Sequence, residues 1–418
     1  MNRGLAEAVV DAFRSEPAES LRERFDAFHE QDWSRSSNWL HTSGLALYFL
    51  SRVRELGIVE IMPPRVLREL EDAHSENRAR TEAMFDEFVK VNMAFQRAKL
   101  SYANLKGFSL APRACPDPSY RYQHDLDFLV SPRDAERCRH AVVSLGYRLK
   151  REYDGSWEFV AGTPEVLSMR DLYRVRSERS LEIHFVSARE QTQSDAYGDR
   201  LLRLQLQVWN GFEFPALSEC DKLLGQAQHL FRHLQSEWTR AAWMLEFTTA
   251  IRSHEGNAAF WADTVALLHD MPQRMVGTGI ASLIASRAFG ATLPKPFFAA
   301  TVGQLPRRVR LWADCYQEDV VFAKHPGSKL YLLLQDVLSQ DCAQLRTQRR
   351  KKLFPLHLPP RVSLAPQECG ARMRLKGILA QMRFTWERLR FHVASGFRYK
   401  IESARWKKLV AHPMGRLR

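Results

Sequence analysis

Two aspartates stand two positions apart in the segment HDLDFLV, residues 124–130. A β-strand directs alternate side chains to opposite faces. Asp125 and Asp127 are therefore predicted to share one face of a strand, with Leu126 and Phe128 on the other. Two neighbouring carboxylates repel each other and need a compensating cation. Because Mg²⁺ prefers oxygen ligands, it is the cation that this pair predicts.

A second predicted strand, SLEIHFV at residues 180–186, places Glu182 on the same face as His184. If the two strands are neighbours, the carboxylate of Glu182 converges with those of the two aspartates. Three such carboxylates are typical of two-metal phosphoryl or nucleotidyl transfer. One ion activates the acceptor oxygen and the other holds a triphosphate. Glu158, in the segment SWEFV, has the same apolar flanks and is the alternative third carboxylate.

The segment LKGFS, residues 105–109, lies at a predicted strand-to-helix junction. There Gly107 would let the backbone approach a phosphate, the helix N-terminus would supply free N–H groups, and Lys106 would add a positive charge. Ser109 is the serine of this turn. Arg121, four residues before Asp125, is expected either to clamp a triphosphate or to neutralise the carboxylates.

Other polar residues have two interpretations each. His184 is either an acid–base group or, as we favour, a structural histidine. A pair of histidines four residues apart has a spacing that can hold a metal, but without an H-E-x-x-H motif we interpret His229 and His233 as packing or capping residues. A basic cluster would bind an anionic acceptor or form a solvated loop; its members are Arg170, Arg174, Arg176 and Arg179.

Together these segments resemble the uncharacterised nucleotidyltransferase family of bacteria. The family pattern reads LKG, then R-x-x-x-D-hydrophobic-D, a short Pro-led helix ending in G-Y, and an E-hydrophobic-H strand. The resemblance covers roughly residues 35 to 270. The matching residues are Lys106, Gly107, Arg121, Asp125, Asp127, Gly146, Tyr147, Glu182 and His184.

The resemblance implies the DNA polymerase β-like nucleotidyltransferase fold and the use of an NTP with Mg²⁺, two ions being expected. Two departures from the pattern concern the site. His124 stands where a glycine often precedes the first aspartate, and Gly107-Phe108-Ser109 replaces the usual Gly-Ser turn of the wider superfamily.

The predicted activity is transfer of a nucleoside monophosphate from an NTP to a hydroxyl or phosphate acceptor, with release of pyrophosphate. A small molecule or a sugar is the favoured acceptor. The catalytic and metal-binding residues would be Asp125, Asp127 and Glu182, and the nucleotide-binding residues Lys106, Gly107, Ser109 and Arg121. Two alternatives stay open: a toxin-like nucleotidyltransferase that modifies RNA or protein, and a non-catalytic nucleotide-binding scaffold.

The sequence pattern around these residues predicts an α+β protein, in which a small mixed β-sheet core is embedded in a mostly helical chain. Residues 1–97 show helical spacing, and short strand-like runs separated by Pro, Gly and Asp follow in 98–190. Helical spacing returns in 191–340. The remaining region, 341–418, is predicted to combine a Pro-containing linker with an amphipathic helix.

Charge is concentrated at the end of the chain. From residue 342 to 418 there are 19 Lys and Arg against 3 Asp and Glu, whereas the other residues hold 42 basic and 45 acidic groups. Such a tail would attract a nucleic acid, an anionic membrane surface or an acidic partner, unless it is only a solvated face. Its helix carries an apolar stripe, which we expect to pack on the protein core rather than on a membrane. The stripe comprises Leu375, Ile378, Leu379, Met382, Trp386, Leu389 and Val393.

The composition, 45% apolar and 26% charged among 418 residues, is that of a globular chain and excludes collagen-like and disordered classes. No apolar run reaches the ~18 residues of a membrane span, and the first residues do not form a signal peptide, so a cytoplasmic location is expected. The six cysteines show no C-x-x-C spacing, which argues against a zinc cluster or a disulfide scaffold.

Overall fold

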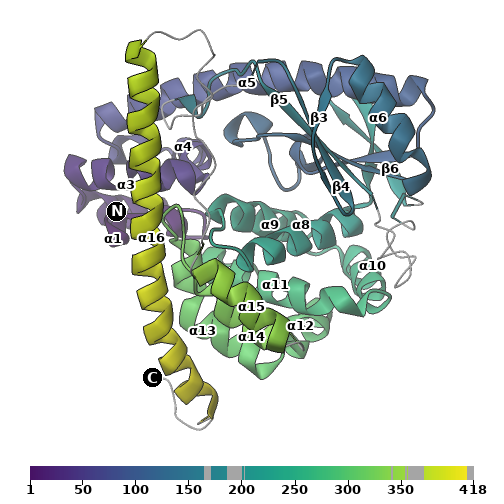
Figure 1. Ribbon diagram of the computed structural model, residues 1–418. Helices are drawn as coiled ribbons and strands as arrows, with labels where there is room; N and C mark the ends of the chain where they lie inside the picture. Colours follow the sequence, from purple (N-terminus) through teal and green to yellow (C-terminus); the bar gives the residue numbers. More distant parts are fainter. Residues whose placement is uncertain are drawn as a thin grey trace.

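The computed structural model describes residues 1–163, 171–185, 200–201, 203–339, 342–353, 355 and 371–411 (Figure 1). Arg170 of the basic cluster lies outside these ranges, as do one of the six cysteines, Cys369, and three prolines of the expected linker, Pro359, Pro360 and Pro366. The side chains of Cys342 and Leu375 are likewise not described.

A seven-stranded mixed sheet forms the centre of the α+β fold, in the order β3-β4-β5-β2-β1-β7-β6. Two neighbouring pairs are parallel, β2 with β5 and β1 with β7, and the other pairs are antiparallel. The strands are β1 (Tyr102–Leu105), β2 (Leu126–Val130), β3 (Arg148–Tyr153), β4 (Ser156–Ala161), β5 (Arg179–His184), β6 (Leu204–Trp209) and β7 (Phe212–Leu217).

Two helices cover one face of the sheet: α5 (Pro64–Arg97) and α6 (Ala135–Ser144). The aromatic side chains of Phe88 and Phe95 from α5 pack against Phe128 of β2, with ring centroids 6.5 and 5.2 Å away. As the sequence predicts, a turn at Ser131-Pro132 precedes α6 and Gly146, with φ of +87°, follows it.

The remaining helices form a second body, whose core combines the two ends of the chain (Figure 1). Helices before the sheet contribute residues such as Val9 and Phe49, and helices after it contribute residues such as Phe247 and Trp312. The first group is α1 (Arg3–Asp11), α2 (Ala18–Asp26), α3 (Glu30–Thr42) and α4 (Leu45–Glu55). The second group is α8 (Glu219–Leu234), α9 (Ala241–Ser253), α10 (Ala258–His269), α11 (Met275–Phe289), α12 (Lys295–Ala300), α13 (Arg307–Val321) and α14 (Tyr331–Leu338).

Two basic helices end the chain: α15 (Cys342–Leu353) and α16 (Ala371–Ala411), the latter running along the outside of the helical body (Figure 1). Contrary to our expectation, the apolar stripe of α16 does not pack on the core. Ile378 and Leu379 at the start of its described part and Val393 near its middle are each more than half exposed. The helix is attached by a different face, on which Tyr399 and Trp406 are buried.

The sheet extends beyond the boundary expected at residue 190. Strands β6 and β7 form a hairpin that ends at Leu217, and β7 pairs with β1, so that the hairpin belongs to the sheet. Cys115, Cys138, Cys220 and Cys315 are free thiols. In the ranges that the structure describes, the helices are too short or too polar to cross a membrane.

Candidate active site

Strands β2 and β5 place Asp127 and Glu182 side by side. The two strands pair in parallel, with Asp127 directly opposite Glu182, so they are the neighbours that a convergence of their carboxylates requires. Their alternate residues, among them Phe128 and Ile183, are fully buried beneath α5 and α6. The sheet therefore anchors both carboxylates from behind and directs them to the opposite face.

One carboxylate oxygen of Asp127 contacts both a lysine ammonium group and a histidine ring. Lys106 Nζ donates to Asp127 Oδ1 over 2.8 Å, and His184 Nε2 lies 2.9 Å from the same oxygen. The His184 ring also lies 3.5 Å from Glu182 Oε2. Asp127, Glu182 and His184 each present a ligand atom within 4.8 Å of the others. They form a cluster that can hold a metal ion.

Asp125 lies just before β2 and is half-buried. It is not among the three residues of that cluster. Burial and the neighbouring Asp127 carboxylate raise the pKa of Asp125 to about 6. Burial alone would also raise the pKa of Asp127, but Lys106 and His184 outweigh it and hold that pKa far below its ordinary value.

The alternative third carboxylate, Glu158, lies one strand further along the same face, opposite Glu182 in the β4–β5 register. It is held there by basic side chains of β3. Lys150 Nζ donates to it over 2.8 Å, and Arg151 Nε lies 3.9 Å away. The geometry therefore favours Glu182 over Glu158 as the neighbour of Asp127.

The turn after β1 differs from the predicted phosphate loop. Gly107 begins a single 3₁₀ turn of four residues, not an α-helix. Its φ of +46° suits glycine, but the space over it is filled, because an added Cβ would clash with the Gln123 side-chain amide. Gln123 in turn donates to the backbone carbonyl of Asp125 over 2.9 Å. Gly107 thus supports the backbone before β2 and does not line the cavity described below.

Ser109 and Arg121 have partners of their own. The Ser109 hydroxyl donates to the carbonyl of Lys106 over 2.7 Å. Arg121 Nε donates over 3.0 Å to Glu246 of α9, which also accepts a hydrogen bond from Tyr48. Arg121 therefore neutralises Glu246 directly, while its charge also lowers the pKa of the nearby Asp125.

A cavity of about 490 Å³ opens beside the cluster, between the sheet and helices α8 and α9. Lys106 and His184, both bound to Asp127, form part of its wall. The rest of the wall is rich in basic side chains, with Glu246 as its one carboxylate among the described residues. Its basic members are Lys106, Arg121, Arg200, Lys222, Arg232 and Arg274.

The histidine pair of α8 lies at this cavity. The rings of His229 and His233 pack against Trp243 of α9, with centroids 4.9 and 4.1 Å from it, and His229 and Trp243 line the cavity. Burial lowers the pKa of His233 to about 4 and that of His229 well below its usual value. Both rings are therefore neutral at pH 7, and their packing role is as predicted.

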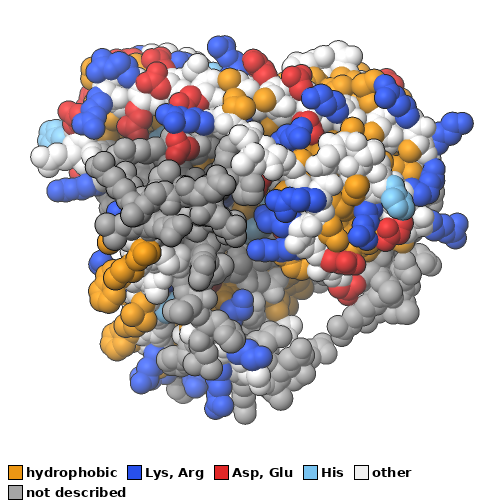
Figure 2. Space-filling view, turned by 45° about the horizontal axis from the view of Figure 1, so that its top comes forward, with side chains coloured by type: hydrophobic (Ala, Val, Ile, Leu, Met, Phe, Trp, Pro, Cys, Tyr) orange, Lys and Arg blue, Asp and Glu red, His pale blue; other side chains and the backbone are white. Residues whose placement is uncertain are grey.

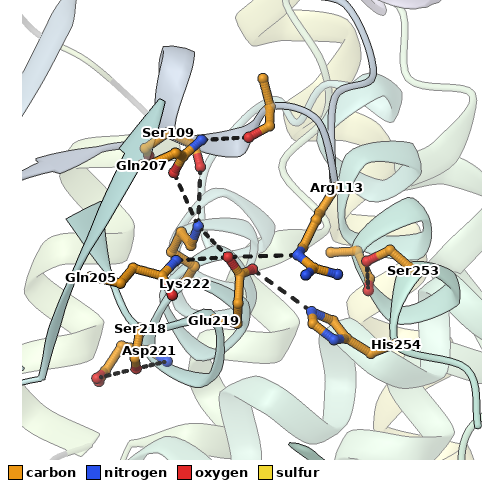
Figure 3. Close-up of polar contacts among 12 residues, drawn as sticks. Ser109, Arg113, Gln205, Gln207, Ser218, Glu219, Asp221, Lys222, Ser253 and His254 are labelled. Carbon is orange, nitrogen blue, oxygen red and sulfur yellow. Dashed lines mark hydrogen bonds and ion pairs between the residues drawn. The ribbon is translucent and has the colours of Figure 1, made fainter. Parts of the chain in front are cut away.

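A polar network positions Lys222 in the cavity wall (Figure 3). Glu219 accepts from Lys222 over 2.6 Å and from Gln205 of β6 over 2.7 Å, and the ring of His254 lies 3.7 Å away. Lys222 also donates to Gln207 of β6 over 3.2 Å. Burial alone would raise the pKa of Glu219. The hydrogen bonds from His254, Lys222 and Gln205, with the positive charge of Lys222, outweigh burial and lower that pKa to about 2.

The predicted basic cluster does not form one anion site. Arg174 pairs with Glu76 and Asp171, at 3.3 and 2.9 Å, while Arg179 pairs with Glu87 at 2.7 Å. Arg176 contacts the side chains of Tyr122 and His124 instead. Each described arginine is thus engaged with separate partners.

Comparison with known proteins identifies the family of the chain. The profile of a family described as "Uncharacterised nucleotidyltransferase" matches residues 29–276, more than half of the chain. The chain belongs to this family. Residues 29–276 run from helix α3 to the first residues of α11 and include every strand of the sheet.

Among solved structures, the chain is similar to an antigenic nucleotidyltransferase-like protein from Paracoccidioides brasiliensis. The two share 12% sequence identity over 50% of this chain and 92% of the other, with a TM-score of 0.30. No curated protein matches the chain.

Sequence reasoning missed two parts of the site. The alternation within residues 180–186 does not indicate that the His184 ring joins Asp127 to Glu182. Lys222 and Arg232 carry no motif of their own. They line the cavity because helices α8 and α9 form its wall opposite the sheet.

Proposed function

We propose that this family member is a divalent-metal-dependent nucleotidyltransferase that transfers a nucleoside monophosphate from an NTP. The observation that carries the proposal is the Asp127–Glu182–His184 cluster at the edge of a basic cavity. A cavity of about 490 Å³ is in the range of small-ligand sites. Its basic wall complements a triphosphate, and its aromatic side at His229 and Trp243 suits a planar base.

The donor set fits a hard divalent cation such as Mg²⁺. Asp125, Asp127 and Glu182 supply carboxylate oxygens. Lys106 and His184 both approach Asp127 Oδ1, which indicates that this oxygen favours a positively charged partner. When bound, the metal would neutralise developing charge on the phosphates and acidify the acceptor hydroxyl. We propose Asp125, Asp127 and Glu182 as its ligands, with His184 beside them.

The residues around the metal would then bind the phosphates and accept the proton of the acceptor. Lys106, Arg121 and the cavity cations Lys222 and Arg232 would hold the β- and γ-phosphates. Glu182 would accept the proton of the acceptor hydroxyl while the hydroxyl oxygen bonds to the α-phosphorus. The bond from the α-phosphorus to the bridging oxygen breaks, and pyrophosphate leaves with the negative charge.

The proposed acceptor is a hydroxyl or phosphate of a small molecule or a sugar. Supporting this choice, the Arg174, Arg176 and Arg179 side chains that would form an extended anion-binding surface are already paired within the chain. The non-catalytic scaffold is less favoured, since it gives no reason for the Asp127 and Glu182 carboxylates to cluster at the edge of a basic cavity.

Thermal unfolding with each of the four NTPs, in Mg²⁺ and in EDTA, tests the proposal. We expect stabilisation that requires Mg²⁺ and is lost in the double variant Asp125→Asn, Asp127→Asn. Glu158→Gln is the matched control, because it removes a carboxylate from the same face one strand away. If no NTP stabilises the wild-type chain, or if the double variant responds equally, the proposal is wrong. Stabilisation without pyrophosphate release on supplying acceptors would favour the scaffold.

A further inference from the structure

Helix α16 displays a long apolar face that the rest of the described structure leaves uncovered. Eight large apolar side chains on it are between 53% and 67% exposed. They span residues 378–401, about 35 Å of helix. Figure 2 shows hydrophobic side chains on the left of the molecule, the side along which α16 runs in Figure 1. The eight, here called the α16 stripe, are Ile378, Leu379, Met382, Trp386, Leu389, Val393, Phe397 and Ile401.

A separate face of the same helix holds it on the protein. Trp406 packs near Tyr316 of α13, with ring centroids 6.1 Å apart, and Ser395 accepts a hydrogen bond from the backbone N–H of Lys329 over 3.0 Å. Arg398 forms an ion pair with Asp319 at 2.6 Å. Because successive residues of a helix turn by about 100°, this attached face lies largely opposite the stripe. The docked helix therefore points its stripe away from α13.

Basic residues accompany the stripe. Residues 378–411 contain eight Lys and Arg but only two acidic residues, Glu387 and Glu402. Both acidic side chains have cationic partners, Arg383 at 2.9 Å and Arg405 at 3.7 Å. A second copy of the helix would bring like charges together, whereas an anionic surface would be attracted.

The stripe also borders a groove between α16 and helices α14 and α15, with a volume of about 1400 Å³. Leu389, Val393 and Phe397 form part of one wall, and Leu333 and Leu353 lie on the other. An apolar recess of this size beside a basic helix accommodates hydrocarbon chains better than a charged polymer.

We propose that α16 binds the surface of an anionic lipid bilayer, with its stripe in the headgroup–acyl boundary and the lysines and arginines that flank the stripe at the headgroups. An amphipathic helix with Trp, Phe and Leu on one side and basic residues around them has the composition of interfacial helices. The helix lies on the membrane and does not cross it. The proposal is independent of the proposed catalytic activity.

Vesicle flotation of the full-length chain tests it, with phosphatidylcholine vesicles compared with phosphatidylcholine–phosphatidylglycerol vesicles. We expect binding to the anionic vesicles that weakens at high salt. The variant Trp386→Ser, Leu389→Ser should reduce the partition coefficient by about tenfold or more. Leu206→Ser, Val208→Ser on β6 is the control, since these side chains are 67% and 60% exposed elsewhere. It should bind as the wild type does.

Several outcomes would overturn the proposal. One is wild-type protein that binds neither kind of vesicle; another is equal loss of binding in the stripe and control variants. A stripe-dependent dimer without vesicle binding would assign the stripe to a second copy of the chain. Binding of an oligonucleotide in place of vesicles would assign the basic residues to a nucleic acid. Circular dichroism of each variant confirms that only the exposed surface has changed.

Discussion

At the scale of single residues, the proposed site depends on Asp127, whose Oδ1 meets both Lys106 and His184. Asp127→Asn keeps the size of the side chain but removes its charge. We expect nucleotidyl transfer to fall by on the order of a thousandfold, because the metal ligand and the charge partner of Lys106 are lost together. Pyrophosphate release measured with excess NTP and acceptor provides the rate.

Glu158→Gln serves as the comparison for this variant. Glu158 is on the same face of the sheet but is paired with Lys150. Its loss should leave the rate within about threefold of wild type. Comparable damage from both substitutions would mean that the general charge of the face matters, not the Asp127 cluster.

The sequence was most informative about residues whose neighbours are local. The alternation within residues 124–130 predicted that Asp125 and Asp127 share a face, and that within residues 180–186 predicted the same for Glu182 and His184. The side-chain contact between Gln123 and Gly107 could not be predicted, since it depends on a backbone conformation with positive φ. The contact from Lys106 to Asp127 likewise required the register of β1 on β2.

At the scale of elements, the turn at Gly107 supports the backbone that carries Asp125. Gly107→Ala would strain a residue with φ of +46° and displace Gln123 from the carbonyl of Asp125. We expect a loss of about 2 kcal/mol of stability and several-fold weaker nucleotide binding. Urea unfolding and nucleotide titration measure the two effects.

Gly57→Ala separates the effect of backbone strain from the effect of displacing the Gln123 side chain. Gly57 also has a positive φ, +65°, but no atom lies within 4 Å of the Cβ that alanine would add. Its substitution should cost about 1 kcal/mol and leave nucleotide affinity unchanged. If both alanine variants weaken nucleotide binding alike, Gln123 has no positioning role.

Glu219 joins α8 to the β6–β7 hairpin, and its effect on stability should depend on pH. Its folded pKa, about 2, is below the ordinary glutamate pKa of 4.5, so its contribution is present above pH 4.5 and is lost as the pH falls toward 2. Allowing for partial exposure, Glu219→Gln should cost on the order of 2 kcal/mol at pH 7. Urea unfolding at pH 7 and pH 3 should show the difference from wild type shrinking in acid. A constant difference would contradict the role of the charge.

The hairpin is also where prediction of the elements was least successful. The segment FEFPAL contains Pro215, which disfavours a strand inside a sheet, and β6 exposes Leu206 and Val208. Neither strand has the run of buried apolar residues that identified β2. Since the sheet continues to Leu217, we propose to place the end of the sheet unit there rather than at residue 190.

At the scale of the whole molecule, the two ends of the chain share one core. Phe13, after α1, packs against Phe289 at the end of α11, with ring centroids 6.3 Å apart. Phe13→Ala should therefore reduce the free energy of unfolding by about 3 kcal/mol, as deletions of buried aromatic side chains do. Exposed Glu23, on α2, is the control, and Glu23→Ala should change stability by less than about 0.5 kcal/mol.

Chemical denaturation followed by circular dichroism gives both values. An effect of Phe13→Ala no larger than that of Glu23→Ala would mean that the N-terminal helices are dispensable for the helical body. That result would separate them from α11 despite their contact.

The same shared core has a consequence for synthesis on the ribosome. Helix α5, α6 and the whole sheet lie between the two sets of helices, and they have a hydrophobic core of their own. This middle part can complete its core while the chain is still growing. Helices α1–α4 must wait until α8 and later helices emerge, on the order of ten seconds at ordinary elongation rates. During that interval their apolar faces are unpaired, so the nascent chain should be a substrate for chaperones even though its sheet can already fold.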